Sequence, residues 1–213
     1  MPVNEKQTAG EVLYQRPIYE HGGISRQYWD YKDNLILKNL SSKDQVIYDI
    51  GCGEGILLEK ICKMAPDRQV CGIDCMAENV AICRQHNLPA KQGSLYSLEI
   101  PDNSADVIFL IEVIEHLTDY ENALKELIRI LKPGGKLVIL FPHDSVFAFA
   151  RFATLKFKEW KYDPGHVKQW THRDLNQTLK GLGMQSILNQ SIPFVFWGIS
   201  LHGLCVSIKP ATA

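Results

Sequence analysis

A glycine-rich segment, Asp49-Ile-Gly-Cys-Gly-Glu-Gly55, ends an apolar run at residues 45–50. Glycines at alternate positions let the backbone turn sharply and approach a ligand closely. An apolar strand that enters such a turn and continues into a helix is the opening unit of a doubly wound α/β sheet. The segment therefore predicts an α/β fold whose ligand site lies at the end of the first strand.

Strand-like apolar runs alternate with helical patterns along most of the chain. The predicted strands lie at 45–50, 70–73, 90–92, 106–111 and 136–141, and the predicted helices lie at 26–40, 56–64, 77–86 and 120–131. Residues 1–25 look irregular, 143–170 has no clear strand, and a helix at 173–182 precedes strands at 184–190 and 204–209. Strands separated by helices need crossover connections, so we expect a doubly wound, mostly parallel sheet in a single domain.

Composition narrows the class of protein. The 213 residues are 46% hydrophobic and 22% charged, which suits one soluble globular domain with a sizeable core. The net charge of −1 does not favour nucleic acid as a partner. No export signal or transmembrane run is visible, and the six cysteines form no C-x-x-C pair. We therefore expect a cytoplasmic protein with reduced thiols.

Two carboxylates indicate which ligand suits the glycine turn. The dinucleotide pattern needs a third glycine at the position of Ile56, and no Gly-Lys-Ser/Thr of a phosphate-binding loop follows. A carboxylate at Asp49 would repel a pyrophosphate but suits a ligand that carries an ammonium group. Asp74 closes the second strand 19 residues after Gly55, near the offset expected of an acid that binds ribose hydroxyls. The sequence therefore favours a positively charged nucleoside ligand without phosphate.

Four segments together resemble the class I methyltransferases. They are Val46–Gly55, Gly72–Asp74, Asp106–Leu117 and Leu131–Leu137. The resemblance covers about residues 45–142 and implies S-adenosylmethionine as cofactor, with S-adenosylhomocysteine as product. It also implies a Rossmann-like, seven-stranded sheet whose last strand is inserted antiparallel.

The resemblance also implies a role for individual residues at the cofactor. Asp49 and the backbone of Gly51, Cys52, Gly53 and Gly55 would hold the methionine part, and Ile111 would line its pocket. Asp74 would hold the ribose, Met76 would pack on the adenine, and Ser94 and Leu95 would face the adenine edge. Ser94 departs from the family, which often has an acid at that position.

The methyl donor is already activated, so the protein mainly has to align the reactants and exclude water. A general base is needed only if the acceptor must lose a proton. Because the acceptor would sit over the loops after the fourth and fifth strands, the candidates are His116, His143 and His166, together with Glu112. Each could equally be a surface or capping residue.

A metal site is an alternative use of the same region. The run Glu112-Val-Ile-Glu-His116, with His166 later in the chain, resembles the metal sites of small-RNA 3′-end ribose methyltransferases. Ubiquinone-pathway O-methyltransferases carry a similar run. Two carboxylates and two imidazoles could hold a divalent ion that positions a vicinal diol. The same run also occurs in methyltransferases without metal, and we favour no metal here.

We divide the single domain by function into four parts. They are an N-terminal cap at 1–40, the cofactor-binding core at 41–142, an acceptor-side lid at 143–170, and a C-terminal helix with the last strands at 171–213. Thr171 is expected to cap the last helix, with Asp174 three residues on. Residues 145–161 combine apolar positions at helical spacing with basic residues, so a lid helix and a peripheral membrane contact are both open.

The activity that these observations favour is methyl transfer to a small-molecule acceptor, on oxygen, with an apolar or aromatic acceptor preferred. A metal-dependent RNA 3′-end ribose methyltransferase and a non-catalytic S-adenosylmethionine-binding protein are the alternatives. The sequence does not name the acceptor or the oligomeric state.

Overall fold

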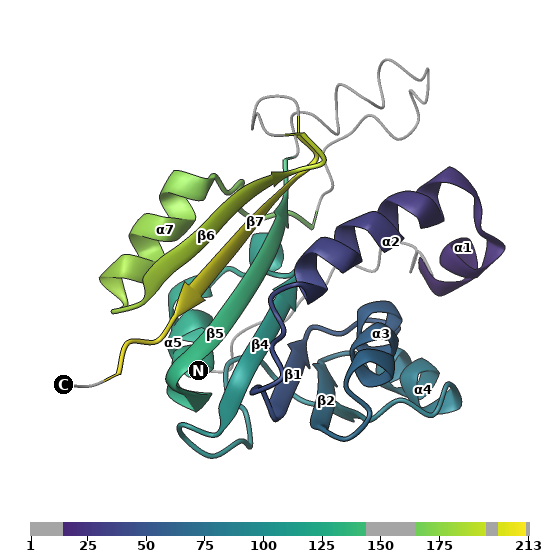
Figure 1. Ribbon diagram of the computed structural model, residues 1–213, viewed down its shortest axis with the longest axis horizontal. Coiled ribbons are helices and arrows are strands. Elements are labelled where there is room, and N and C mark those ends of the chain that lie inside the picture. The colour runs from purple at the N-terminus through teal and green to yellow at the C-terminus, as the bar shows by residue number, and fades with distance from the viewer. Residues whose placement is uncertain (1–14, 144–164, 195–199, 212–213) are drawn as a thin grey trace.

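The computed structural model describes residues 15–143, 165–194 and 200–211, and they form a seven-stranded sheet with helices on both faces (Figure 1). The strands are β1 (Val46–Ile50), β2 (Gln69–Asp74), β3 (Ala90–Gln92), β4 (Ala105–Ile111), β5 (Leu131–Pro142), β6 (Gln185–Ile192) and β7 (His202–Ile208). Their order in the sheet is β3-β2-β1-β4-β5-β7-β6. The first five strands are parallel, whereas β7 pairs antiparallel with both β5 and β6. The expected mostly parallel sheet with an antiparallel last strand is confirmed.

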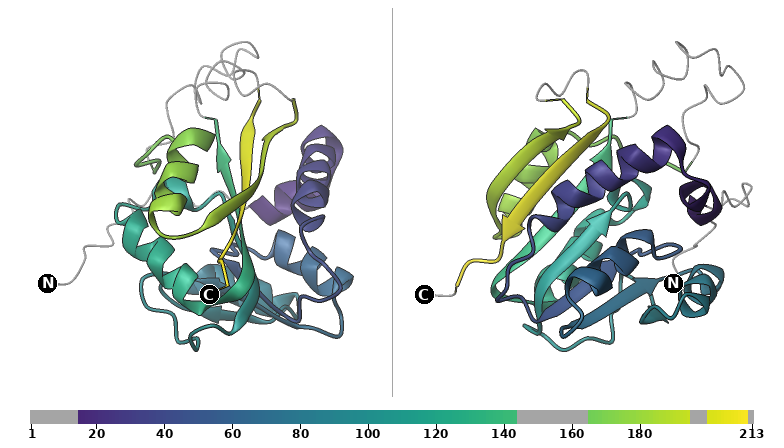
Figure 2. Two further views of the ribbon diagram at one scale, coloured as in Figure 1. Left: turned by 60° about the vertical axis from the view of Figure 1, so that its left-hand side comes forward. Right: turned by 45° about the vertical axis from the view of Figure 1, so that its right-hand side comes forward.

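Two layers of helices cover the sheet. The helices are α1 (Gln15–His21), α2 (Gly23–Leu37), α3 (Ile56–Met64), α4 (Ala77–Gln85), the short 3-10 turn η1 (Ile114–His116), α5 (Tyr120–Ile130) and α7 (His172–Gly181). One face carries α2 and α3, and the opposite face carries α5 and α7 (Figure 2). Among the described residues, no helix is long and apolar enough to cross a membrane.

Alternate residues of the central strands supply the two halves of the core. Val107 and Phe109 of β4 face α2 and α3, while Ile108 and Leu110 of the same strand face α5 and α7. All four side chains are fully buried. Because both faces are covered, the central strands carry apolar residues on both faces, which explains the continuous runs in the sequence.

Most predicted elements appear within a few residues of their expected bounds, and the helix at 56–64 and the strand at 90–92 match them fully. The expected irregular N-terminus is wrong for residues 15–21, which form α1, and for residues 23–25, which begin α2. The β5 strand begins at Leu131, earlier than predicted, because Leu131 already pairs with Ala105 of β4; the register then shifts, and Lys136 pairs with Val107. Thr171 caps α7 as predicted, since its hydroxyl accepts from the Asp174 N–H. The predicted lid helix at 145–161 lies outside the described residues.

The sheet brings the functional segments to one edge. The glycine segment follows β1, Glu112 follows β4, and the antiparallel β7 begins with His202 opposite Pro142 at the end of β5. The helices α1 and α2 lie over this edge (Figure 1). This is the carboxyl edge of the parallel strands, where ligands bind in open α/β sheets.

Candidate functional site

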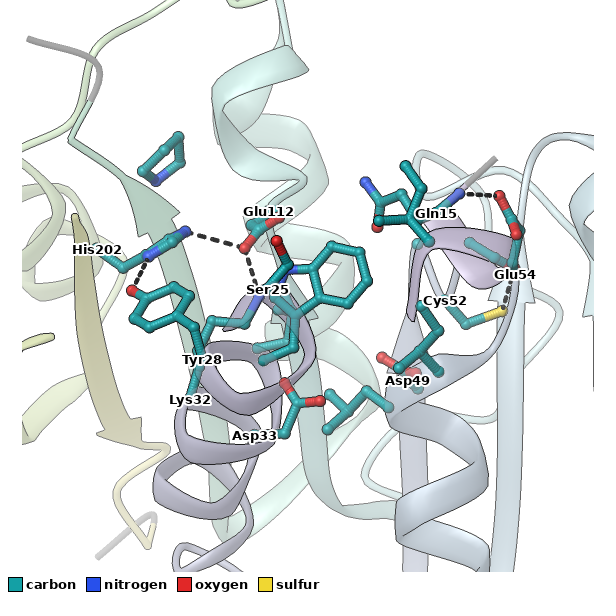
Figure 3. Close-up of a pocket in the computed structure, with 18 of the residues that line it drawn as sticks. Gln15, Ser25, Tyr28, Lys32, Asp33, Asp49, Cys52, Glu54, Glu112 and His202 are labelled. Carbon is teal, nitrogen blue, oxygen red and sulfur yellow. Dashed lines mark hydrogen bonds and ion pairs between the residues drawn. The ribbon is translucent and has the colours of Figure 1, made fainter. Parts of the chain in front are cut away.

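A cavity of about 980 Å³ opens at this edge of the sheet (Figure 3). Residues of the glycine segment line one side, and Glu112, Pro142, Leu201 and His202 line the other. Tyr28 and Trp29 of α2 line it as well, together with Gln15 and Ile18 of α1. The cavity therefore joins the loop predicted to bind the cofactor to the strand ends predicted to bind the acceptor.

The glycine segment turns through backbone angles that favour glycine. Gly51 has φ +71°, and a Cβ added there would collide with the side chain of Val113. Gly53 has φ +52°, but a Cβ there would meet no atom of the described residues within 4 Å. Gly51 and Gly53 both line the cavity, so the segment presents bare backbone to a ligand.

Asp49, the next-to-last residue of β1, is 2% exposed and lines the cavity. Burial, with the nearby Cys83, Asp33 and Asp74, raises the pKa of this carboxyl to about 8. Within the described part of the chain, its Oδ2 atom has no hydrogen-bond partner. A buried carboxylate oxygen without a partner is unfavourable until a cationic donor reaches it, so Asp49 suits a ligand with an ammonium group.

Asp74 lies beside the glycine segment but is not part of the cavity lining. Its Oδ2 accepts from the Gly53 N–H at 2.8 Å, and its Oδ1 accepts from the Met76 N–H at 2.9 Å and from the Asn79 amide at 3.2 Å. Met76 and Asn79 do line the cavity. Asp74 thus holds the loop in shape, and its predicted contact with a ribose stays a prediction.

Some of the other predicted cofactor residues line the cavity and some do not. Cys52 and Ile111 line the cavity, whereas Gly55, Ser94 and Leu95 do not. The hydroxyl of Ser94 accepts from the Tyr96 N–H at 3.3 Å, within its own turn. Of the predicted adenine contacts, Met76 alone lines the cavity, whereas Ser94 and Leu95 lie outside its lining.

The three predicted histidines are not brought to one place. His116 and His166 line the cavity with ring centroids 4.8 Å apart. His143 follows β5 outside the cavity lining, and its Nδ1 lies 3.2 Å from the Ser200 carbonyl. His116 and His166 therefore share a site that does not include His143.

A cluster with metal-ligand chemistry forms around these two histidines. Ligand atoms of Glu115, His116 and His166 all lie within 4.8 Å of one another. The Nδ1 atom of His116 lies 2.9 Å from the Gly165 carbonyl, so its Nε2 faces Glu115 at 4.0 Å. A carbonyl on one ring nitrogen commonly orients the other toward a metal. Glu112, the first residue of the sequence run, is paired elsewhere.

Glu112 instead joins a network that the sequence did not reveal. Its Oε1 accepts from the Lys32 ammonium at 2.6 Å and lies 3.0 Å from Nε2 of His202 (Figure 3). The Nδ1 atom of His202 lies 2.7 Å from the hydroxyl of Tyr28. All four side chains line the cavity. Spacing alone could place Tyr28 and Lys32 on one face of a helix, but nothing in the sequence linked them to His202.

The N-terminal helix is tied to the glycine segment. The N–H groups of Gln15 and Arg16 each donate to a carboxylate oxygen of Glu54 at 2.8 Å, and Arg16 Nε donates to the Glu54 carbonyl at 2.9 Å. Arg16 is 4% exposed. These contacts hold α1 at the mouth of the cavity. Residues 1–14 of the predicted N-terminal cap lie outside the described residues.

Comparison with known proteins identifies the family of the core. Residues 48–139 match the family described as "Methyltransferase domain". A protein named "Ubiquinone biosynthesis O-methyltransferase" from Xanthomonas oryzae pv. oryzae is 31% identical over 164 residues, which are 68% of each chain. A protein of the same name from Rhodopseudomonas palustris is 32% identical over 145 residues, 64% of this chain and 56% of that one. Two further relatives, from Mycobacterium tuberculosis and Schizosaccharomyces pombe, bear only general methyltransferase names.

The chain spans 62%, 56% and 57% of the length of three curated relatives that it matches. Among solved structures, a chain from the complex between the Haloferax volcanii Trm112 methyltransferase activator and a methyltransferase is similar, with a TM-score of 0.71. That match is 16% identical and covers 93% of this chain and 96% of the other. At this identity the likeness concerns the fold alone.

Proposed function

This chain belongs to the class I S-adenosylmethionine-dependent methyltransferases, and we propose that it transfers the methyl group of that cofactor to an oxygen of a small apolar or aromatic acceptor. The transfer moves the methyl group from the sulfonium of the cofactor to the acceptor and leaves S-adenosylhomocysteine. The protein has to hold both reactants in line and keep water out.

The observation that carries the proposal is the partnerless Oδ2 of Asp49 at the cavity wall. The α-ammonium of S-adenosylmethionine is a donor of the right charge for this oxygen, and an ammonium–carboxylate hydrogen bond is among the stronger ones. Gly53 provides the space that the amino-acid part needs, because no described side chain fills the room over its Cα. The residues present therefore fit the methionine end of the cofactor.

The acceptor is proposed to occupy the other end of the cavity. Pro142 and Leu201 lie beside Glu112 and His202 at that end, and Ile24 and Trp29 of α2 add apolar lining to the same cavity. The ion-paired Glu112 and the buried His202 are the polar groups among them. An apolar wall with a few polar groups suits a small aromatic molecule with a hydroxyl. The names of the two ubiquinone O-methyltransferase relatives support oxygen as the methylated atom.

A methyl-transfer assay tests this proposal. We would incubate the protein with S-adenosylmethionine labelled in its methyl group and with a panel of phenols and catechols. We expect labelled product and S-adenosylhomocysteine in equal amounts, measured by mass spectrometry. Cofactor binding without S-adenosylhomocysteine formation for any acceptor would instead support the non-catalytic alternative.

The cluster of Glu115, His116 and His166 favours a second candidate, metal-assisted methylation of a vicinal diol, which includes the RNA 3′-end ribose. One carboxylate and two imidazoles suit Mn²⁺, Fe²⁺ or Zn²⁺. Ligand atoms about 2.1 Å from one ion lie at most about 4.2 Å apart. The observed 4.8 Å spread therefore needs only a small closure to hold an ion.

Metal content tests the second candidate. If the metal is part of the mechanism, protein that is incubated with Mn²⁺ and then gel-filtered should keep about one ion per chain. Atomic emission measures this metal content. His166→Ala should lose the ion because it removes one of three ligands. His21→Ala, at the exposed end of α1, is the matched control and should keep it. Equal metal content in all three proteins would remove the metal from the mechanism.

A further inference from the structure

Four side chains from distant parts of the chain meet at the acceptor end of the cavity. Tyr28 and Lys32 come from α2, Glu112 follows β4, and His202 begins β7 (Figure 3). The side chains form a continuous chain of polar contacts. Lys32 Nζ lies 2.6 Å from Glu112 Oε1, and the same oxygen lies 3.0 Å from His202 Nε2. His202 Nδ1 is in turn 2.7 Å from the Tyr28 hydroxyl. Such a chain can carry a proton away from a bound acceptor.

The charge on Glu112 determines which atoms of His202 and Tyr28 carry the protons. Burial opposes ionisation of Glu112, but the Lys32 ammonium and His202 outweigh it and hold the pKa of Glu112 well below its usual range. A carboxylate only accepts hydrogen bonds, so Nε2 of His202 must carry the proton that points to Glu112. In the neutral ring Nδ1 is then the acceptor, and the Tyr28 hydroxyl donates to it.

His202 is in the neutral state that a general base needs. Burial lowers the pKa of His202 despite the opposing effect of the Glu112 carboxylate. The charged groups that face it are Glu112, after β4, and Lys32 and Asp33 on α2. The ring is therefore neutral near pH 7 and can accept a proton, while Glu112 stabilises the imidazolium that forms.

The backbone at Glu112 is held in an unusual conformation. Its φ is +56°, in the left-handed region that side-chain-bearing residues seldom adopt. Its N–H donates to the Leu140 carbonyl at 2.9 Å, which fixes the turn after β4. Strained backbone of this kind gathers at functional sites, where it aims a side chain. Here it directs the carboxylate to Lys32 and His202.

From this geometry we propose that Tyr28, His202 and Glu112 form a proton relay for the methylated hydroxyl. The proposal rests on the proposed transfer to oxygen. The acceptor O–H bond breaks as its oxygen forms the bond to the methyl carbon, and the carbon–sulfur electron pair stays on sulfur. The acceptor proton passes to the Tyr28 oxygen while the Tyr28 proton passes to His202 Nδ1. Tyr28 contacts the acceptor, and Glu112 is a positioning residue that acts through His202.

The relay is tested by comparing acceptors that need a base with acceptors that do not. A simple phenol has a pKa of about 10 and must lose its proton during the reaction, whereas a nitrocatechol with a pKa below 7 is already ionised at pH 7.5. Tyr28→Phe keeps the ring that stacks on His202 but removes the hydroxyl link. We expect kcat of Tyr28→Phe and of His202→Asn to fall about 100-fold with the phenol and less than about 3-fold with the nitrocatechol.

Two controls separate the relay from loss of fold or of cofactor. Both variants should bind S-adenosylmethionine within about twofold of the wild type by calorimetry, because neither residue is among those predicted to hold the cofactor. Tyr31→Phe removes a hydroxyl from the same helix outside the cavity lining and should leave kcat unchanged. The wild-type kcat with the phenol should also rise with pH to a plateau, and this plateau should disappear in His202→Asn.

The outcomes distinguish the relay from the function on which it rests. If the wild type binds the cofactor but methylates no phenol or catechol, transfer to oxygen is wrong and the relay is lost with it. If the wild type methylates both acceptors and Tyr28→Phe is equally slow, or equally fast, with each, the relay alone is wrong. A deficit confined to the acceptor of high pKa supports it.

Discussion

Replacing Asp49 by asparagine is expected to weaken the binding of S-adenosylmethionine about 100-fold at pH 8. The change removes the charge from a buried hydrogen bond to an ammonium group, and such bonds contribute about 1.5–3 kcal/mol. Calorimetric titration measures the affinity. The matched ligand is 5′-methylthioadenosine, which lacks the ammonium and should bind the wild type and Asp49→Asn equally. An equal loss for both ligands would contradict the contact between Asp49 and the ammonium.

The affinity for S-adenosylmethionine should also depend on pH through the ionisation of Asp49. The apo carboxyl has a pKa of about 8, so binding the ammonium at pH 7 releases most of one proton. The α-amino group of the ligand itself titrates near pH 8, so affinity falls again above that value. We expect a maximum near pH 8 and a loss of about 20-fold at pH 6. Asp49→Asn should show no loss on the acid side.

The same substitution should stabilise the empty protein. An aspartate in the unfolded chain ionises near pH 3.9, whereas Asp49 in the fold ionises near pH 8. Because the raised pKa means that the folded state binds the extra proton, this residue lowers stability as pH rises through that window. Asp49→Asn should therefore unfold several degrees higher than the wild type at pH 8, with little difference at pH 4. A lower midpoint at pH 8 would show that the carboxylate is already satisfied.

Replacing Gly51 by alanine is expected to reduce the free energy of unfolding by about 3 kcal/mol. The new Cβ would collide with Val113, and φ of +71° is unfavourable for any side chain. Urea unfolding followed by circular dichroism gives the difference. A loss below about 1 kcal/mol would mean that the turn after β1 can relax.

Gly53→Ala is the matched comparison because it carries backbone strain without a collision. Its φ is +52° and the added Cβ meets no described atom within 4 Å, so stability should fall by only about 1 kcal/mol. The Cβ would nevertheless project where the backbone meets the proposed cofactor, so S-adenosylmethionine affinity should fall at least tenfold. Unchanged affinity in Gly53→Ala would place the cofactor elsewhere in the cavity.

The fold was largely predictable because its signals are local. Buried strands read as apolar runs, and the predicted helix at 56–64 begins directly after Gly55. The N-terminal helix α1 was missed because its contacts are not local: Arg16 is held by Glu54, 38 residues away. Its own sequence contains Pro17 and no acidic residue in the first turn, so it has few of the usual helix signals.

The site was predictable only where motifs sit at strand ends. Asp49 and Gly53 line the cavity, as their places at the end of β1 and just after it suggested. Glu112 was assigned to a possible metal cluster because it stands three residues before Glu115 and four before His116. Its backbone takes a left-handed turn, which sends its carboxylate to Lys32 and His202 instead. Tyr28 and His202 are 174 residues apart, and only the insertion of β7 beside β5 brings them together.

Calorimetric titration of the wild-type protein with S-adenosylmethionine at pH 8 tests most directly whether this cavity is the cofactor site of a methyltransferase. We expect saturable binding of one cofactor per chain with micromolar affinity, lost about 100-fold in Asp49→Asn. The absence of binding at 1 mM cofactor, in protein shown by circular dichroism to be folded, would contradict a methyltransferase site at this end of the sheet.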